Sequence, residues 1–318
     1  MAYVEWLNAG PLSREIAGGK GASLSELVAA GFTVPPGFSV VAEGYRHFID
    51  ANDLEGRVDA VLRITDLMEP TGAREAAEQI SSLVLAAPLP EDLSEEIASA
   101  YDALVTRSGI ACAVRSSAIS EDGESASFAG LYETYLNVAG VGEVLDRVRR
   151  CYASLWSERG VRYRAKQASG AGTHEAMAVV VMGLVQSEVS GIAFTAHPVT
   201  GATDQVVINA SWGLGEAIVA GLVTPDSFVV EKDSFTVLER EICEKELAHL
   251  PHPSGVGTVE TLLDAEQASA PSLQDDEAVA VAQMAVRIEA HYGSPQDIEW
   301  AMQGGQLYLL QSRPITTL

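Results

Sequence analysis

The part of the chain that says most about the fold is residues 296–314, which read QDIEWAMQGGQLYLLQSRP. Two strands are predicted, over residues 296–303 and 306–313, because β-compatible runs flank a Gly-Gly pair. Glycine accepts the positive φ angles of a tight hairpin turn, so Gly304-Gly305 marks the connection. This stretch therefore predicts an antiparallel β-hairpin.

Three polar side chains of the hairpin share a face only under one condition. Side chains alternate between the two faces of a strand, so Gln311 and Arg313 point the same way, about 6–7 Å apart. A two-residue turn would pair Glu299 with Leu310 and leave Gln311 on the opposite face. A three-residue turn, or a β-bulge, would bring Glu299, Gln311 and Arg313 together. The three would then suit one metal ion and one polyphosphate, and a plain two-residue hairpin would contradict that site.

Composition places the chain among soluble globular proteins of about two domains, since it has 318 residues, 47% hydrophobic and 20% charged. The net charge of −24 opposes binding to nucleic acid and to anionic membranes. Cys112, Cys151 and Cys243 are widely spaced and form no CxxC pair, as expected of reduced thiols. No apolar run approaches the length of a membrane span, and the first residues do not resemble a signal peptide. A cytoplasmic protein is expected.

Helical and strand-like patterns are unevenly distributed. Before Lys166 the apolar spacing is mainly helical, and after it β-patterns separated by Gly- and Pro-containing turns dominate. This order predicts an α+β protein of two lobes, residues 1–185 and 186–318, with a cleft between them. The clearest helices are expected over residues 21–30 and 143–158, and the clearest strands over residues 111–115, 176–185, 192–195, 206–210, 227–231 and 235–240.

Gly18-Gly19-Lys20-Gly21 opens the first predicted helix and could bind an anion. Glycines let the backbone approach a ligand, a helix N-terminus attracts negative charge, and the lysine adds a cation. The spacing is not that of a GxxxxGK[ST] P-loop. Taken alone, such a motif is more often an ordinary turn.

A second cation, Arg115, stands at a predicted strand end before a loop of small residues, ESASFAG at 124–130. Backbone N–H groups of such a loop can close over phosphates, and Thr134 could add a hydroxyl. The alternative is a solvated strand end and a flexible surface turn. Residues 211–216, SWGLGE, are better explained by close packing of a strand against a helix than by a ligand.

Taken together, these motifs indicate a function more strongly than any one of them does alone. Lys20 and Arg115 supply cations from the first lobe, while Glu299, Gln311 and Arg313 supply oxygen ligands and a further cation from the second. Phosphoryl transfer requires cations on the phosphates, Mg²⁺ on oxygen ligands and a loop that excludes water. No GxSxG elbow supports acyl transfer as an alternative.

An ordered set of runs carries a family resemblance over essentially the whole chain. The runs are GGKGASL (18–24), VPPGF (34–38), VRSSA (114–118), ASFAG (126–130), SEVSGIAFT (187–195), NASWGLGE (209–216), DIEW (297–300) and QSRPIT (311–316). With them the chain resembles the ATP-binding part of the phosphoenolpyruvate synthase/pyruvate phosphate dikinase superfamily, and within it most closely the rifamycin phosphotransferase branch. Within that branch, residues 197–201 and 224–226 are the better discriminators, although they are much less decisive than the superfamily runs.

The resemblance implies an ATP-grasp fold, with the nucleotide and Mg²⁺ in a cleft between two lobes. Residue by residue, it implies phosphate contacts from Lys20, Arg115 and Arg313, which are also the expected catalytic residues. Mg²⁺ would be bound by Glu299 and Gln311. The loop over the phosphates would include Gly130 and Thr134. The family usually has glutamine at Met182, where it contacts the nucleotide, and also at Leu131.

Relatives of this kind pass the β-phosphate of ATP to a histidine on a swivelling domain, which carries it to an acceptor in a substrate domain. The chain contains no such histidine loop after the last of these runs, so the resemblance implies that both domains lie elsewhere, in a longer protein or a separate subunit. Expected products are AMP and phosphate, with a rifamycin hydroxyl or pyruvate as acceptor. The alternatives are a nucleotide-binding module without transfer, and a kinase acting directly on a small molecule.

Overall fold

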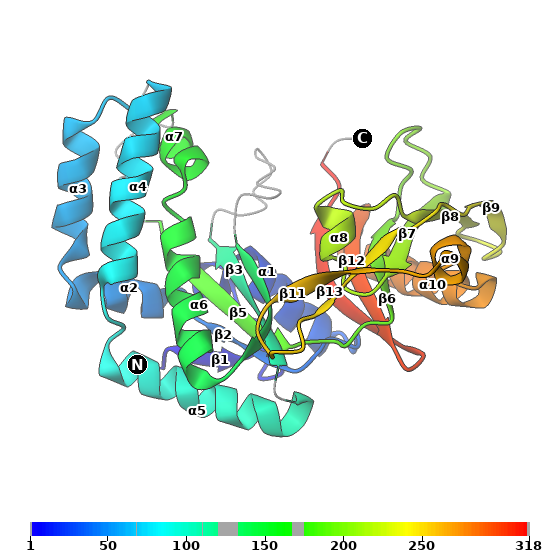
Figure 1. Cartoon of the computed structure of the whole chain (residues 1–318), viewed down its shortest axis with the longest axis horizontal. Helices are drawn as coiled ribbons and strands as arrows, with labels where there is room; N and C mark the ends of the chain where they lie inside the picture. The colour runs from blue at the N-terminus through cyan, green and yellow to red at the C-terminus, as the bar shows by residue number, and fades with distance from the viewer. Residues whose placement is uncertain (1, 68, 110, 120–132, 167–174, 317–318) are drawn as a thin grey trace. The chain divides into compact units, whose positions relative to one another are not determined.

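The computed structural model describes residues 2–67, 69–109, 111–119, 133–166 and 175–316 (Figure 1). It is 41% helical and 28% strand, which confirms a protein of mixed helix and sheet. The chain forms two compact units. Unit 1 comprises residues 1–30 and 36–184, and unit 2 comprises residues 31–35 and 185–318.

Unit 1 is built on a five-stranded antiparallel sheet with strand order β1-β2-β5-β3-β4. One face carries the apolar core, where Phe38, Val114 and Val181 are fully buried among helices. The strands are β1 (Val4–Trp6), β2 (Gly37–Val40), β3 (Ala111–Ala118), β4 (Thr134–Ala139) and β5 (Met177–Gly183). The helices are α1 (Arg14–Ala29), α2 (Ala42–Ala51), α3 (Leu54–Ile64), α4 (Pro70–Ala86), α5 (Glu91–Ser108), α6 (Val141–Ser154) and α7 (Glu158–Lys166).

Helix α1 covers the other face of this sheet. Gly21 of α1 lies so close that an added Cβ would stand 3.3 Å from Ser39 Oγ on β2 and 3.5 Å from Val180 Cγ2 on β5. Ser39 and Val180 are register partners, so they share that face. The core helices and α1 therefore sandwich the sheet.

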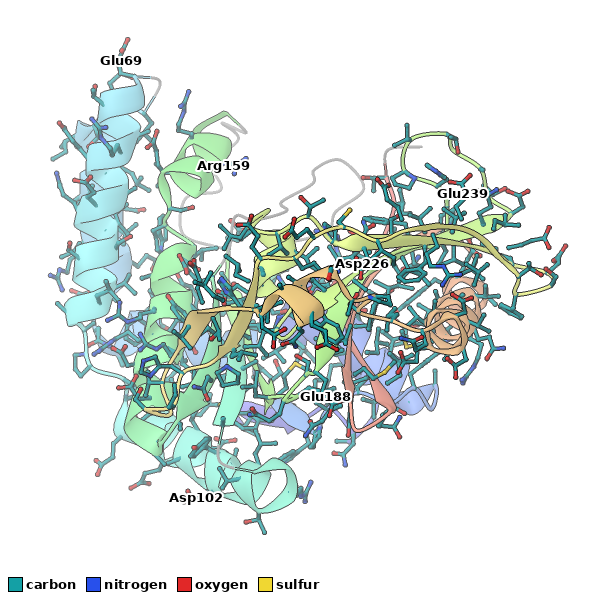
Figure 2. The ribbon with its side chains drawn as sticks, turned by 45° about the vertical axis from the view of Figure 1, so that its right-hand side comes forward. Glu69, Asp102, Arg159, Glu188, Asp226 and Glu239 are labelled. Carbon is teal, nitrogen blue, oxygen red and sulfur yellow. The ribbon has the colours of Figure 1, made fainter. Side chains whose placement is uncertain are left out.

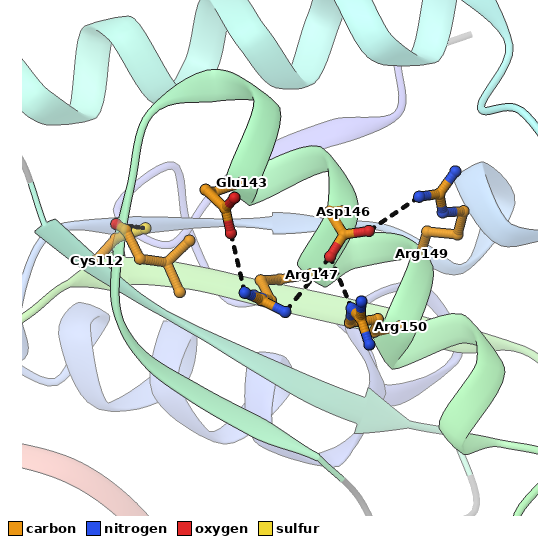
Figure 3. Close-up of polar contacts among 7 residues, drawn as sticks. Cys112, Glu143, Asp146, Arg147, Arg149 and Arg150 are labelled. Carbon is orange, nitrogen blue, oxygen red and sulfur yellow. Dashed lines mark hydrogen bonds and ion pairs between the residues drawn. The ribbon is translucent and has the colours of Figure 1, made fainter. Parts of the chain in front are cut away.

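On α6, one carboxylate gathers three arginines (Figure 3). Asp146 accepts hydrogen bonds from Arg150 Nε at 2.6 Å, Arg149 at 2.9 Å and Arg147 at 3.4 Å. Arg147 also bonds Glu143 at 2.9 Å. Burial would raise the pKa of the Asp146 carboxyl, but the bonds from Arg150 and Arg149 outweigh it and lower the pKa.

Asp146→Asn should lower the free energy of unfolding by about 1 kcal/mol at neutral pH, because partly exposed ion pairs contribute at that scale. The folded-state pKa of Asp146 is lowered, so its contribution is present above the ordinary aspartate pKa of about 3.9 and is lost as the pH falls through the folded value. Urea unfolding of both proteins between neutral and acidic pH measures this. A difference in stability that grows as the pH falls would contradict it.

Unit 2 contains a six-stranded antiparallel sheet with strand order β13-β12-β6-β7-β8-β9, and a separate hairpin, β10-β11. Helix α10 packs on one sheet face through fully buried Val281, Ala285 and Ile288. The strands are β6 (Val189–Phe194), β7 (Gln205–Trp212), β8 (Asp226–Glu231), β9 (Val237–Glu241), β10 (Leu247–Pro251), β11 (Thr258–Leu262), β12 (Gln296–Gln303) and β13 (Gln306–Pro314). The helices are α8 (Glu216–Val219), α9 (Ala265–Ser269) and α10 (Asp275–Tyr292).

A buried ion pair lies inside unit 2, at Asp226 (labelled in Figure 2). Asp226 and Lys245 are both fully buried, with Lys245 Nζ 2.7 Å from Asp226 Oδ1. The carboxylate also accepts hydrogen bonds from the backbone N–H of Cys243 at 3.0 Å and from the N–H and hydroxyl of Ser272, both at 2.7 Å. One carboxylate therefore ties together three segments that are distant in sequence.

Residues 31–35 belong with unit 2 although residues on both sides belong with unit 1. The carbonyl of Thr33 accepts a hydrogen bond from Leu309 N on the edge strand β13, at 2.9 Å. The guanidinium of Arg287 on α10 lies 4.9 Å from the ring centroid of Phe32. This short segment therefore covers part of the sheet edge of unit 2.

Within the described ranges, no helix combines the length and the apolar character that a membrane crossing requires.

Candidate functional site

The β12–β13 hairpin has a two-residue turn and a bulge. Gln303 pairs with Gln306 across Gly304 and Gly305, whose φ angles are +57° and +74°. The expectation of an odd-length turn is therefore wrong. The register shifts further along, because Trp300 pairs with Leu309 whereas Glu299 pairs with Gln311, which leaves Leu310 as the extra residue. The alternative prediction of a bulge is confirmed, and Glu299 and Gln311 share one face.

Packing determines which face of the sheet Glu299 occupies. Trp300 and Ile298 are fully buried on the α10 side of the sheet. An added Cβ on Gly191 of β6 would stand 2.7 Å from Cζ2 of Trp300, so the indole occupies the space that a side chain there would need. Since neighbouring side chains on a strand alternate, anchoring Trp300 in the core turns Glu299 to the opposite face.

This opposite face of unit 2 is polar and half-buried at its centre. Gln311 pairs with Glu299, and the row of register partners continues across the sheet through Ile192 on β6, Asn209 on β7 and Ser227 on β8. Glu299, Asn209 and Ser227 are half-buried, whereas Ile298, Ile208 and Phe228 of the opposite face are fully buried. A row of carboxylate, amide and hydroxyl groups on an incompletely covered sheet face is suited to a polar ligand.

Arg313 lies on the same face and is held by a residue that sequence reasoning did not select. Asp297 is its register partner, and Asp297 Oδ2 accepts hydrogen bonds from Arg313 Nε at 2.8 Å and from a terminal nitrogen at 2.6 Å. Strand alternation could have pointed to Asp297, since it stands two residues before Glu299 in the same strand and therefore shares its face. Asp297 therefore orients the guanidinium beside the Glu299–Gln311 pair.

The donor set fits one hard cation. Glu299 and Gln311 present a carboxylate and a carboxamide from directly opposite positions. In the part of the chain that the structure describes, no group of three or more His, Cys, Asp or Glu side chains could hold a metal by itself. Mg²⁺ typically takes one or two protein oxygens and fills its remaining positions with water and phosphate oxygens, so these residues fit Mg²⁺ bound with a polyphosphate.

In unit 1, Lys20 follows a break in α1. Gly18 has φ +68° and ψ −178°, outside helical values, and the helix resumes at Gly19. Only glycine fits there, because an added Cβ would stand 2.0 Å from the carbonyl oxygen of Ser117 on β3. Lys20 therefore lies in the first turn of a new helical segment, where the N-terminal dipole favours an anion.

Arg115, Thr134 and Met182 lie on the sheet face that α1 covers. Arg115 is the register partner of both Thr134 and Val180, and Met182 is the partner of Ala113, two residues from Arg115. Arg115 and Met182 are buried, and Thr134 is exposed. Unit 1 thus brings Lys20, Arg115, Thr134 and Met182 to one side of its sheet. Gly130 and Leu131 lie outside the described residues.

Comparison with known proteins identifies a family and several relatives. Residues 14–318 match the family model described as "Pyruvate phosphate dikinase, AMP/ATP-binding domain". A phosphoenolpyruvate synthase of Pyrococcus furiosus is 41% identical over 365 residues, covering 100% of this chain and 44% of the relative. A probable phosphoenolpyruvate synthase of Methanocaldococcus jannaschii is 40% identical and covers 100% and 27%. One of Methanothermobacter thermautotrophicus is 42% identical and covers 95% and 44%.

The chain spans less than half the length of these relatives, between 27% and 44%. They are named as phosphoenolpyruvate synthases, so the expected likeness to the rifamycin phosphotransferase branch is not supported. The superfamily expectation is confirmed on a match over nearly the whole sequence. This chain belongs to the pyruvate phosphate dikinase AMP/ATP-binding domain family.

Proposed function

We propose that this chain binds ATP with Mg²⁺ and is the nucleotide part of a dikinase-type phosphotransferase of the phosphoenolpyruvate synthase kind. The observation that carries the proposal is the bulged hairpin, which sets Glu299 opposite Gln311 and beside Arg313 on one half-buried face. With the histidine and substrate domains of a complete protein, ATP, pyruvate and water would yield AMP, phosphoenolpyruvate and phosphate. The fold of this nucleotide part would be of the ATP-grasp kind.

Each site residue has a distinct task in this proposal. Lys20, Arg115 and Arg313 neutralise phosphate oxygens, where charge accumulates during transfer. Glu299 and Gln311 hold Mg²⁺, which supplies further charge neutralisation on the polyphosphate. The loop that covers the phosphates would include Gly130 and Thr134.

Met182 stands at the position where the family resemblance implies a glutamine that contacts the nucleotide. Its side chain is 2% exposed and carries a thioether, which is at most a weak hydrogen-bond acceptor. We infer that Met182 contacts the nucleotide by packing alone. A pocket with fewer hydrogen bonds to the base discriminates less sharply between bases.

Binding tests the first part of the proposal. Glu299→Gln and Lys20→Ala should each weaken ATP binding in the presence of Mg²⁺ by about 10- to 100-fold, since a hydrogen bond to a charged group contributes about 1.5–3 kcal/mol. Isothermal titration calorimetry measures the dissociation constant. Glu239→Gln, which removes an exposed carboxylate on β9, is the matched control and should leave the constant unchanged. Wild-type chain that binds no ATP would refute the proposal.

Transfer is tested with ATP labelled at the β-phosphate and a separately produced cognate histidine domain. Label on that domain, together with AMP, is the expected result. ADP formed without the domain would instead indicate direct transfer to a small molecule. As a control, the histidine domain is shown to accept label from the nucleotide part of the protein it was taken from. If the present chain then binds ATP but leaves that domain unlabelled, it is a nucleotide-binding module without transfer.

A further inference from the structure

The hydroxyl of Ser117 fills the break in α1. Ser117 Oγ donates a hydrogen bond to the carbonyl of Ala17 at 2.7 Å and accepts one from the N–H of Gly21 at 3.1 Å. Ala17 and Gly21 are four residues apart, so in an uninterrupted α-helix these two backbone groups would bond each other. A side chain inserted into this ladder is a recognised cause of a sharp helix kink.

The inserted hydroxyl links the two segments that carry the candidate phosphate ligands of unit 1. Along α1, Lys20 immediately precedes Gly21, whose N–H the hydroxyl holds. Along β3, Arg115 is two residues before Ser117 and therefore points to the same face. Ser117 is fully buried, and its carbonyl lies against Gly18 where no Cβ fits. The start of the helical segment that carries Lys20 is thereby fixed to the strand that carries Arg115.

The neighbouring serine makes a comparison within the same strand. Ser116 is equally buried, at 1% exposure, and its hydroxyl donates to the carbonyl of Glu133 at 2.9 Å. Its side chain points to the face opposite Arg115, and the backbone bond from Ser116 N to the same carbonyl, at 3.0 Å, does not depend on the side chain. Ser116 thus shares the chemistry and burial of Ser117 without contacting α1.

We propose that Ser117 is a positioning residue for ATP binding, which sets Lys20 relative to Arg115 by holding α1 open at Gly18. The inference rests on the proposed function. Without the hydroxyl, the Ala17 carbonyl and the Gly21 N–H can bond each other directly, so the helix tends to close and carries Lys20 with it. Cations that neutralise one polyphosphate must be placed to within a fraction of an ångström to act together.

The test compares ATP dissociation constants, measured with Mg²⁺, for Ser117→Ala and Ser116→Ala. Ser117→Ala should raise the constant by about 10- to 100-fold, the scale expected of a misplaced ligand group. Ser116→Ala should stay within about twofold of wild type, because its side chain does not contact α1 and the backbone bond from Ser116 N to Glu133 remains. Ser117→Cys, which replaces the hydroxyl with a somewhat larger thiol that bonds more weakly, should lie between wild type and Ser117→Ala.

A double-mutant cycle separates positioning from a general loss of stability. In a Lys20→Ala background, Ser117→Ala should have little further effect on the dissociation constant, because the residue that it positions is gone. Should Ser117→Ala fail to fold, the cycle is run with Ser117→Cys. Effects of Ser117 and Lys20 that simply add, or a dissociation constant for Ser117→Ala equal to that of Ser116→Ala, would overturn the inference. Wild-type chain that binds no ATP would overturn it together with the proposed function.

Discussion

Replacing Asp226 with alanine is expected to lower the free energy of unfolding by about 3–5 kcal/mol, the scale for breaking a fully buried ion pair. The variant would leave the ammonium of Lys245 without its carboxylate at a position with no exposed side-chain surface. It would also remove the acceptor of the bonds from Cys243 N and from the N–H and hydroxyl of Ser272. A buried charge that loses its partner carries its full desolvation penalty.

Urea unfolding, followed by circular dichroism, measures the effect. A double variant, Asp226→Leu with Lys245→Met, removes both charges and should recover much of the lost stability, because apolar replacement of a buried pair is often neutral. Asp233→Ala, at an exposed aspartate in the β8–β9 turn, is the control and should change stability by less than about 0.5 kcal/mol. A cost for Asp226→Ala that matches this control would show that the pair is not a structural anchor.

Deleting Leu310 is expected to preserve ATP binding, although it shortens a strand that carries three site residues. At the bulge the register passes from Gln311 to Leu309 on β13 while it passes from Glu299 to Trp300 on β12, so a chain without Leu310 can keep Glu299 opposite Gln311 and Trp300 opposite Leu309. Gln311 and Arg313 keep their face. The dissociation constant for ATP with Mg²⁺ should therefore rise by less than about tenfold, which corresponds to about 1.4 kcal/mol.

Deleting Ser312 is the matched comparison, since it removes one residue from the same strand. Here Arg313 would fall opposite Ile298, which is fully buried on the α10 face. A guanidinium cannot enter that core without a large penalty, so ATP binding should be lost or the hairpin should unfold. Titration calorimetry and circular dichroism on both variants measure this. Equal damage from the two deletions would contradict the register argument.

The hairpin shows how far sequence reasoning reaches. Alternation and the Gly-Gly pair were enough to predict both strands and the turn position, and parity showed that Glu299 and Gln311 required a correction to the register. Parity could not choose between a longer turn and a bulge, because each adds one residue between the pairs. Packing of Trp300 against Gly191, on another strand, fixes the face of Glu299, and no local pattern contains that contact.

The break in α1 was invisible for the same reason. A helix was predicted from residue 21, whereas α1 begins at Arg14 and is interrupted at Gly18. The hydroxyl that fills the interruption comes from Ser117, 100 residues from the carbonyl it contacts. Asp297 was missed for another reason. Its contact with Arg313 depends on which residue of β13 lies opposite Asp297, and that residue is known only once the bulge is placed.

The place of residues 31–35 in unit 2 limits how the molecule can be divided. The chain enters unit 2, returns to unit 1, and enters unit 2 again after Leu184, so no single cut separates the two. A fragment that starts at Val185 would lack Thr33 and its bond to Leu309 on β13. It would present a bare strand edge to other molecules, and such edges promote aggregation. Dissection of this protein therefore has to carry residues 31–35 along with the fragment, as a peptide or as a graft.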